Sequence, residues 1–117
     1  MLDRQDALLV RIVVGLYSFH QDKPLYECLM LKARELNLLS ATATQGRMGL
    51  AAIDVRLARK SLAGPWDTPI VIELVDLPDR IREFIEAAEP LLANTRTTVQ
   101  EVTILSAKSS AAEKEAR

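Results

Sequence analysis

The spacing of apolar residues first predicts a strand and then a helix. Leu8–Val14 is a β-branched run with apolar residues at every second position, which predicts a strand. Apolar residues next recur at three- and four-residue intervals from Pro24 to Asn37, which predicts an amphipathic helix. Pro24 suits the first turn of this helix because no helical hydrogen bond needs an N–H there.

Three later segments also have the pattern of strands. Ser40–Gln45 is rich in threonine and small residues, and Gly46 and Gly49 follow it. Ile70–Val75 is the most strand-like run, and its apolar residues on both sides predict a position at the centre of the sheet. Thr98–Leu105 mixes β-branched and polar residues, as a strand with one exposed face does.

A second helix is predicted between the last two of these strands. Asp76 is a candidate cap, Pro78 suits the first turn, and apolar residues continue at helical spacing to about Leu92. Residues 94–97 then have the composition of a turn.

Two segments lie outside these elements. Leu50–Leu57 fits both an alternating strand and one face of a helix, and we interpret residues 47–68 as a strand or a flexible arm. Residues 106–117 are small and charged, which predicts a disordered tail. Residues 1–105 are therefore expected to form a single domain.

The order of elements predicts the fold class. Strand, helix, strand, arm, strand, helix and strand match the α+β, ferredoxin-like βαββαβ sandwich, in which two helices cover one face of an antiparallel sheet. The opposite face of such a sheet still needs cover, because a bare apolar face is usually buried against another subunit. A homo-oligomer is therefore expected.

Composition narrows the class of protein. Hydrophobic residues make up 49% of the chain, charged residues 26%, and the formal net charge is -1, which is typical of a globular protein and implies no nucleic-acid partner. No apolar run approaches the roughly 20 residues of a spanning helix, so no membrane insertion is expected. Cys28 is the single cysteine and no secretion signal is evident, so a cytoplasmic location is expected.

Several short motifs occur in an order that resembles a known family. They are Pro24–Glu27, Lys32–Leu36, Ala41–Ala43 with Gly46 and Gly49, Pro69–Asp76, Ile81 with Phe84, and Thr97–Val102. Over residues 8–105 the chain resembles the P-II-like signalling proteins of the nitrogen regulatory P-II (GlnB-like) superfamily, in the branch called domain of unknown function 190.

The resemblance implies a regulatory protein rather than an enzyme. It implies a compact homotrimer that binds an adenine nucleotide or a similar small anionic effector in clefts between subunits, and a long loop that docks on a transporter or an enzyme. That loop would correspond to the residues after Gly46 and before Pro69. The ligand-binding residues are then expected to be Thr42, Gly46, Arg47, Gly49, Arg96 and Thr97.

The chain departs from the P-II pattern at three places. Ser40 stands where the family often has glycine, and the glycine- and lysine-rich phosphate loop is absent between Leu92 and Val99. Residues 47–68 contain no tyrosine, so control by tyrosine nucleotidylation is not expected.

The candidate ligand residues also have plainer structural interpretations. Gly46 and Gly49 could present backbone N–H groups to an anion, or could form a bulge or the end of a strand. Thr42 could contact a ligand, or could be a threonine favoured in a strand by β-branching. Arg96 and Thr97 could contact a ligand, or could be favoured only by the turn.

The arm carries the candidate partner-binding residues. Arg56, Arg59 and Lys60 could meet phosphate or an acidic partner, or could form a solvated face. Trp66 is either a packing anchor or a hot spot for a partner. Glu73, in the most apolar strand, is expected to pair across a subunit interface or to face solvent near an edge.

Catalysis and metal binding have little support in the sequence. His20 is the only histidine, and no nucleophile motif, glycine-rich dinucleotide motif or P-loop lysine accompanies it. A metal site would need more ligands than scattered carboxylates provide. The leading hypothesis is therefore a nucleotide-binding trimeric regulator; the alternatives are a constitutive trimeric adaptor without a small-molecule ligand and, more remotely, an enzyme acting on a small anion.

Overall fold

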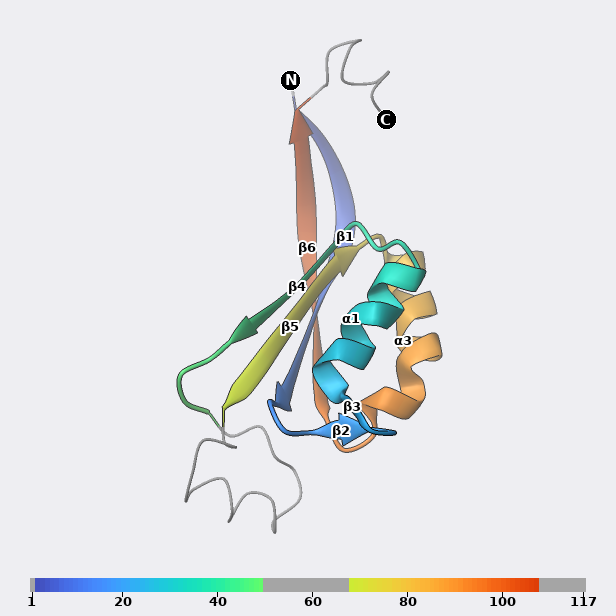
Figure 1. Ribbon diagram of the computed structural model, residues 1–117. Helices are drawn as coiled ribbons and strands as arrows, with labels where there is room; N and C mark the ends of the chain where they lie inside the picture. The colour runs from blue at the N-terminus through green and yellow to red at the C-terminus, as the bar shows by residue number, and fades with distance from the viewer. Residues whose placement is uncertain (1, 50–67, 108–117) are drawn as a thin grey trace, which may run out of the picture.

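The computed structural model describes residues 2–49 and 68–107, which form a sheet, two helices and a short hairpin. The strands are β1 (Leu2–Gly15), β2 (Phe19–His20), β3 (Lys23–Pro24), β4 (Ser40–Gln45), β5 (Pro69–Asp76) and β6 (Arg96–Ala107), and the helices are α1 (Leu25–Glu35) and α3 (Pro78–Leu92), as Figure 1 shows.

The main sheet has the order β4-β5-β1-β6, and every neighbouring pair is antiparallel. Both helices lie on the same face of this sheet (Figure 1). The predicted ferredoxin-like arrangement is therefore confirmed, and so is the central position of the strand over residues 70–75. We call the side without helices the outer face.

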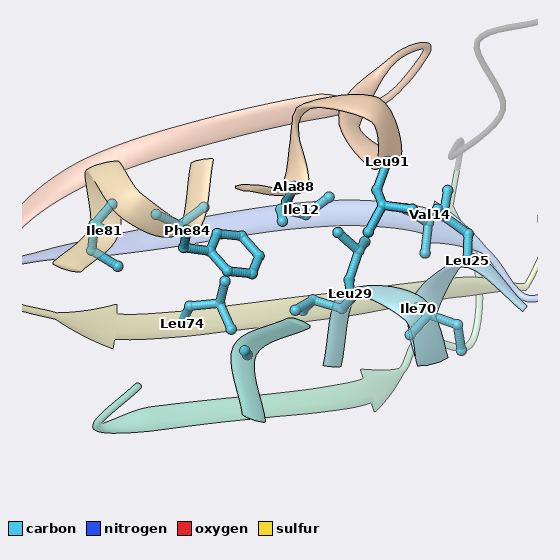
Figure 2. Packing of buried hydrophobic residues seen from close by; sticks show 13 residues of the cluster. Ile12, Val14, Leu25, Leu29, Ile70, Leu74, Ile81, Phe84, Ala88 and Leu91 are labelled. Carbon is cyan, nitrogen blue, oxygen red and sulfur yellow. The ribbon is translucent and has the colours of Figure 1, made fainter. Parts of the chain in front are cut away.

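The core lies between the sheet and the two helices. Ile12 on β1, Leu74 on β5, Leu29 on α1 and Phe84 on α3 are each fully buried and point into this layer (Figure 2). These residues follow the two periods read from the sequence, because alternate strand positions and every third or fourth helix position face one another across the core. The core thereby holds the helices against one face and leaves the outer face bare.

Asp76 has a different role from the helix cap that the sequence suggested. Its side chain is buried, and α3 begins after Leu77 without a side-chain cap. One carboxylate oxygen accepts a hydrogen bond from the Leu77 N–H at 2.6 Å, and the other accepts one from the Leu39 N–H at 3.0 Å. Asp76 therefore ties the entry of β4 to the junction between β5 and α3.

The first and last strands of the chain, β1 and β6, are longer than the pattern of apolar residues indicates. β1 and β6 pair along their full extension, from Val13 opposite Arg96 to Leu2 opposite Ala107. β6 thus continues through Ser106 and Ala107, into the segment predicted as a tail. The polar residues at the start of β1 are tolerated because this part of the pair is exposed on both faces.

A small hairpin that sequence reasoning missed connects β1 to α1. Phe19 pairs with Pro24 and His20 with Lys23, and the two residues between them, Gln21 and Asp22, have positive φ angles of 49° and 67°. Two successive left-handed residues are the requirement of a tight two-residue hairpin turn. His20 is thereby placed at the end of a local turn.

No described helix is long and apolar enough to cross a bilayer.

Replacing Phe84 with alanine should destabilise the fold strongly. The side chain is fully buried, so its loss leaves a cavity that the two layers cannot close, and the expected loss in unfolding free energy is about 3–5 kcal/mol. Urea denaturation at fixed protein concentration measures this loss. Glu89→Ala, at an exposed position on the same helix, is the matched control and should change the value by less than about 0.5 kcal/mol.

Candidate functional site

Most of the candidate ligand residues lie at one end of the sheet. At this end β4 stops at Gln45, which pairs with Ile70, and Ile70 in turn pairs with Val14. β6 starts at the same end, where Arg96 pairs with Val13. Residues 46–49 after β4 and residues 96–97 at the start of β6 therefore share one end of the molecule.

These residues nevertheless lie at opposite edges of the sheet. β4 and β6 are its two outer strands, with β5 and β1 between them. Three strand spacings of about 4.8 Å each place the two edges about 14 Å apart. We call Thr42, Gly46, Arg47 and Gly49 the β4 half-site, and Arg96 with Thr97 the β6 half-site. One chain does not bring the two half-sites into a single cleft.

In the β4 half-site, Gly46 is required by a close approach of two backbone segments. Its N–H donates a hydrogen bond to the Pro69 carbonyl oxygen at 2.8 Å. A Cβ added at Gly46 would stand 2.8 Å from Cγ of Pro69, and one at Gly49 would stand 3.0 Å from the same atom. The strand-end interpretation is therefore supported at Gly46, and its N–H is already engaged and not free for an anion.

The other two residues of the β4 half-site are exposed. Thr42 pairs with Glu73 and lies on the outer face, while Arg47 follows the end of β4. Exposure leaves the Arg47 guanidinium able to meet a phosphate group or a partner carboxylate.

The residues of the β6 half-site point in opposite directions. Arg96 is exposed on the outer face, whereas Thr97 pairs with Ile12 and lies on the helix face. The hydroxyl oxygen of Thr97 is buried and has no hydrogen-bond partner among the described residues. The hydroxyl of Thr95, nearby in the turn, donates to the Leu92 carbonyl oxygen at 2.8 Å.

An ion pair crosses the middle of the outer face. Arg11 donates to one carboxylate oxygen of Glu73 through two nitrogens, at 2.7 and 3.1 Å. Thr42 and Thr98 continue this cross-strand row on the two outer strands. The expected edge position of Glu73 is wrong, because β5 is a central strand, and within one chain its carboxylate pairs with Arg11. Sequence reasoning missed Arg11, although a lone arginine within an apolar strand was the available signal.

A groove between α1 and β4 was also missed by sequence reasoning. It has a volume of about 560 Å³ and lies beside the open edge of β4. Its lining is mainly apolar, with one carboxylate, one guanidinium and one amide at its border. The lining residues are Glu27, Met30, Leu31, Ala33, Arg34, Asn37, Leu38 and Ala41.

Some predicted features fall outside what the structure covers. Arg56, Arg59, Lys60 and Trp66 of the predicted arm lie outside the described residues. Within residues 2–49 and 68–107, no three histidine, cysteine, aspartate or glutamate side chains gather as a metal site would require.

The chain belongs to the DUF190 family, whose description is "Uncharacterized ACR". The profile of this family matches residues 7–104, which include both helices, all of β4 and β5, and most of β1 and β6.

P-II-like proteins are among the solved structures that resemble this one. The apo form of CPII from Thiomonas intermedia K12, a nitrogen regulatory PII-like protein, matches with a TM-score of 0.62 and 11% identity, over 92% of this chain and 100% of that one. CPII bound to ADP, AMP and bicarbonate matches with a TM-score of 0.56 and 11% identity, over 90% and 99% of the two chains.

A third match comes from another organism. A putative PII-like signaling protein from Thermus thermophilus has a TM-score of 0.55 and 14% identity, over 89% of this chain and 92% of that one. At these identities the likeness establishes a shared P-II-like fold.

Gly46→Ala should destabilise the protein, because the new methyl group would overlap the Pro69 ring. The expected loss in unfolding free energy is about 1–3 kcal/mol, measured by chemical denaturation. Thr44→Ala, at an exposed position two residues earlier, should change it by no more than about 0.5 kcal/mol. Equal values for the two variants would contradict the assigned close approach.

Proposed function

We propose that this protein is a P-II-like regulator that binds an adenine nucleotide, or a similar small anionic effector, in clefts between copies of the chain. The observation that carries this proposal is the separation of the two half-sites. Both lie at the same end of the sheet, yet on its two opposite outer strands. Two copies placed with β4 of one beside β6 of the next would bring complementary halves together.

The chemistry of the half-sites suits an anionic ligand. Each half contributes one exposed arginine, Arg47 from one edge and Arg96 from the other. Guanidinium groups bind phosphate oxygens through paired, charge-assisted hydrogen bonds. Thr42 adds an exposed hydroxyl group, whereas the Thr97 hydroxyl is buried on the helix face, away from Arg96. ADP and AMP in the CPII structures support this class of ligand.

The outer face supports self-association. Leu9 lies opposite Val75 and Val13 opposite Val71 on the two central strands, and all four side chains are only partly buried. Arg11 and Glu73 lie between these apolar pairs, and their opposite charges neutralise each other within one chain. The two central strands thus present apolar surface without an unpaired charge, and such a surface can be covered without a charged partner. We propose a homotrimer closed by this face.

Control of a partner completes the proposal. Residues 47–68 leave the sheet directly from the β4 half-site, so a bound effector would lie at the base of this segment. Arg56, Arg59, Lys60 and Trp66 are the proposed partner contacts, and the partner would be a transporter or an enzyme. The protein itself acts as a regulator and not as an enzyme in this proposal. The alternative is an adaptor that holds its partner without any small-molecule ligand.

Calorimetric titration with ATP, ADP, AMP and cyclic AMP tests nucleotide binding. Saturable binding is expected, and Arg47→Ala or Arg96→Ala should weaken it by about 1.5–3 kcal/mol, or roughly 10- to 150-fold in the dissociation constant. Arg82→Ala is the control, because Arg82 is an exposed arginine on α3 that lies away from both half-sites. Absence of binding by the intact oligomer would instead favour the constitutive adaptor.

Mixed oligomers test whether the cleft lies between copies. If Arg47→Ala and Arg96→Ala subunits are unfolded and refolded together at equal amounts, about one quarter of the clefts should receive an intact arginine from each side. Titration of the mixture should then recover that fraction of wild-type sites. If no wild-type binding sites are recovered, both arginines belong to the same half of a cleft or lie outside the site.

Val13→Glu should dissociate the proposed trimer, because it buries an unpaired carboxylate in the apolar outer face. Sedimentation equilibrium should show a fall toward the subunit mass of 13.0 kDa, while circular dichroism remains native. Glu86→Gln, at an exposed position on α3, is the control and should leave the mass unchanged. An unchanged mass for Val13→Glu would exclude the outer face as the interface.

A further inference from the structure

The first six residues of β1 have an open edge. β1 pairs with β6 from Leu2 onward, but it pairs with β5 only from Leu8 to Gly15. Figure 1 shows β1 and β6 continuing together as a two-stranded ribbon beyond the ends of β4 and β5. Since alternate residues of a strand direct their N–H and C=O groups to each side, Leu2–Ala7 presents unpaired backbone groups. Leu2–Asp6 are exposed, whereas Ala7 is buried and lines a pocket with Pro78 at the end of this edge.

The charges along this edge follow a definite pattern. Asp3, Arg4 and Asp6 are charged and exposed, and Gln5 lies between the last two. Arg4 and Asp6 share one face of the strand, because they are two residues apart. The ion pairs of the described residues involve none of these three side chains.

The order of charges favours one register in which this edge can pair with the same edge of a second copy of the chain. Two copies of a strand related by a two-fold axis run antiparallel with their faces preserved, so the residue on the axis lies opposite its own copy. An axis at Asp3, Arg4 or Asp6 would place a like charge directly opposite itself, which is destabilising. An axis at Gln5 places Arg4 opposite Asp6 of the second copy, and Asp6 opposite Arg4 of the second copy.

The same register fits the length of the open edge. With Gln5 on the axis, Asp3 lies opposite Ala7 of the second copy. The pairing therefore spans five residues of each strand. It ends before Leu8, where the edge of β1 is already taken by Asp76 of β5.

We propose that residues Asp3–Ala7 of β1 form a second self-association surface, which pairs antiparallel with the same segment of a second copy about Gln5. The product is a four-stranded ribbon of β6 and β1 from each copy, held by backbone hydrogen bonds and two symmetric Arg4–Asp6 ion pairs. This surface is separate from the outer face and would join two of the assemblies that the outer face builds. An interface this small is weak by itself, so joining trimers adds avidity.

A cysteine scan tests the register. In a Cys28→Ser background, Gln5→Cys should form an intermolecular disulfide under mild oxidation, because opposed residues of antiparallel strands have Cα atoms about 4.5–5.5 Å apart. The product runs at twice the subunit mass on non-reducing gels. Asp3→Cys is the matched control and should form far less, because its thiol would lie opposite Ala7 of the second copy. Preferential cross-linking at position 3, 4 or 6, or at none, would overturn the proposal.

Charge exchange tests the ion pairs independently. Arg4→Glu alone and Asp6→Arg alone each place like charges opposite one another, so both should lower cross-linking at Gln5→Cys several-fold. An equal mixture of these two variants should restore it, because the introduced glutamate then faces the introduced arginine, and the native Asp6 faces the native Arg4 of the other chain. Failure of the mixture to recover would show that the second copy is not the partner of this edge, and that a strand from another protein would be needed to cover it.

The outer face variant separates this inference from the proposed trimer. When Val13→Glu is added, cross-linking at Gln5→Cys should fall with the loss of avidity but stay above that at Asp3→Cys, since the ribbon lies beyond the end of β5. Loss of the outer-face assembly with cross-linking retained would support two independent surfaces. Loss of both together would show that the ribbons meet only within the trimer and would overturn a separate surface.

Discussion

Burial of the apolar face of β1 and β5 beneath α1 and α3 is the constraint on which the rest of this structure depends. Ile12, Ile72 and Leu74 are completely buried in the same cluster as Leu29 and Phe84. The sheet therefore has a fixed inner side, and every residue one position along a strand is forced to the outer side. That alternation decides on which face Arg11 and Glu73 lie, together with the half-site residues that belong to β4 and β6.

The bare outer face and the separated half-sites have a common explanation. A four-stranded sheet with both helices on one side has one uncovered face and two uncovered edge strands. Each exposed surface can be satisfied by another copy of the chain, with the face closing an oligomer and the edges meeting at its clefts. Asp76 fixes the start of β4 and Gly46 fixes its end against Pro69, so the position of the β4 half-site follows from two specific contacts.

The Arg11–Glu73 pair shows how a polar contact fits within an apolar surface. Both side chains are partly exposed in the isolated chain, where such a pair contributes little to stability. Covering the face would remove water from around the pair and would make its loss costly, because a single charge would then be buried without a partner. The pair is thus compatible with association only while both members are present.

The sequence by itself determined the periodic elements and the fold class. Alternation in residues 8–14 and 70–75, helical spacing in residues 25–35 and 78–92, and the order of these elements each reflect local stereochemistry that no distant contact had to supply. The same pattern could not show the ends of β1 and β6, because residues 2–7 and 106–107 are polar and become strand only by pairing with each other. Tertiary structure alone decided that Glu73 meets Arg11, that Asp76 binds Leu39, and that Arg47 and Arg96 lie at opposite edges. Each of these depends on which strands become neighbours, and that choice is made by burial of the whole core rather than by the residues of any one segment.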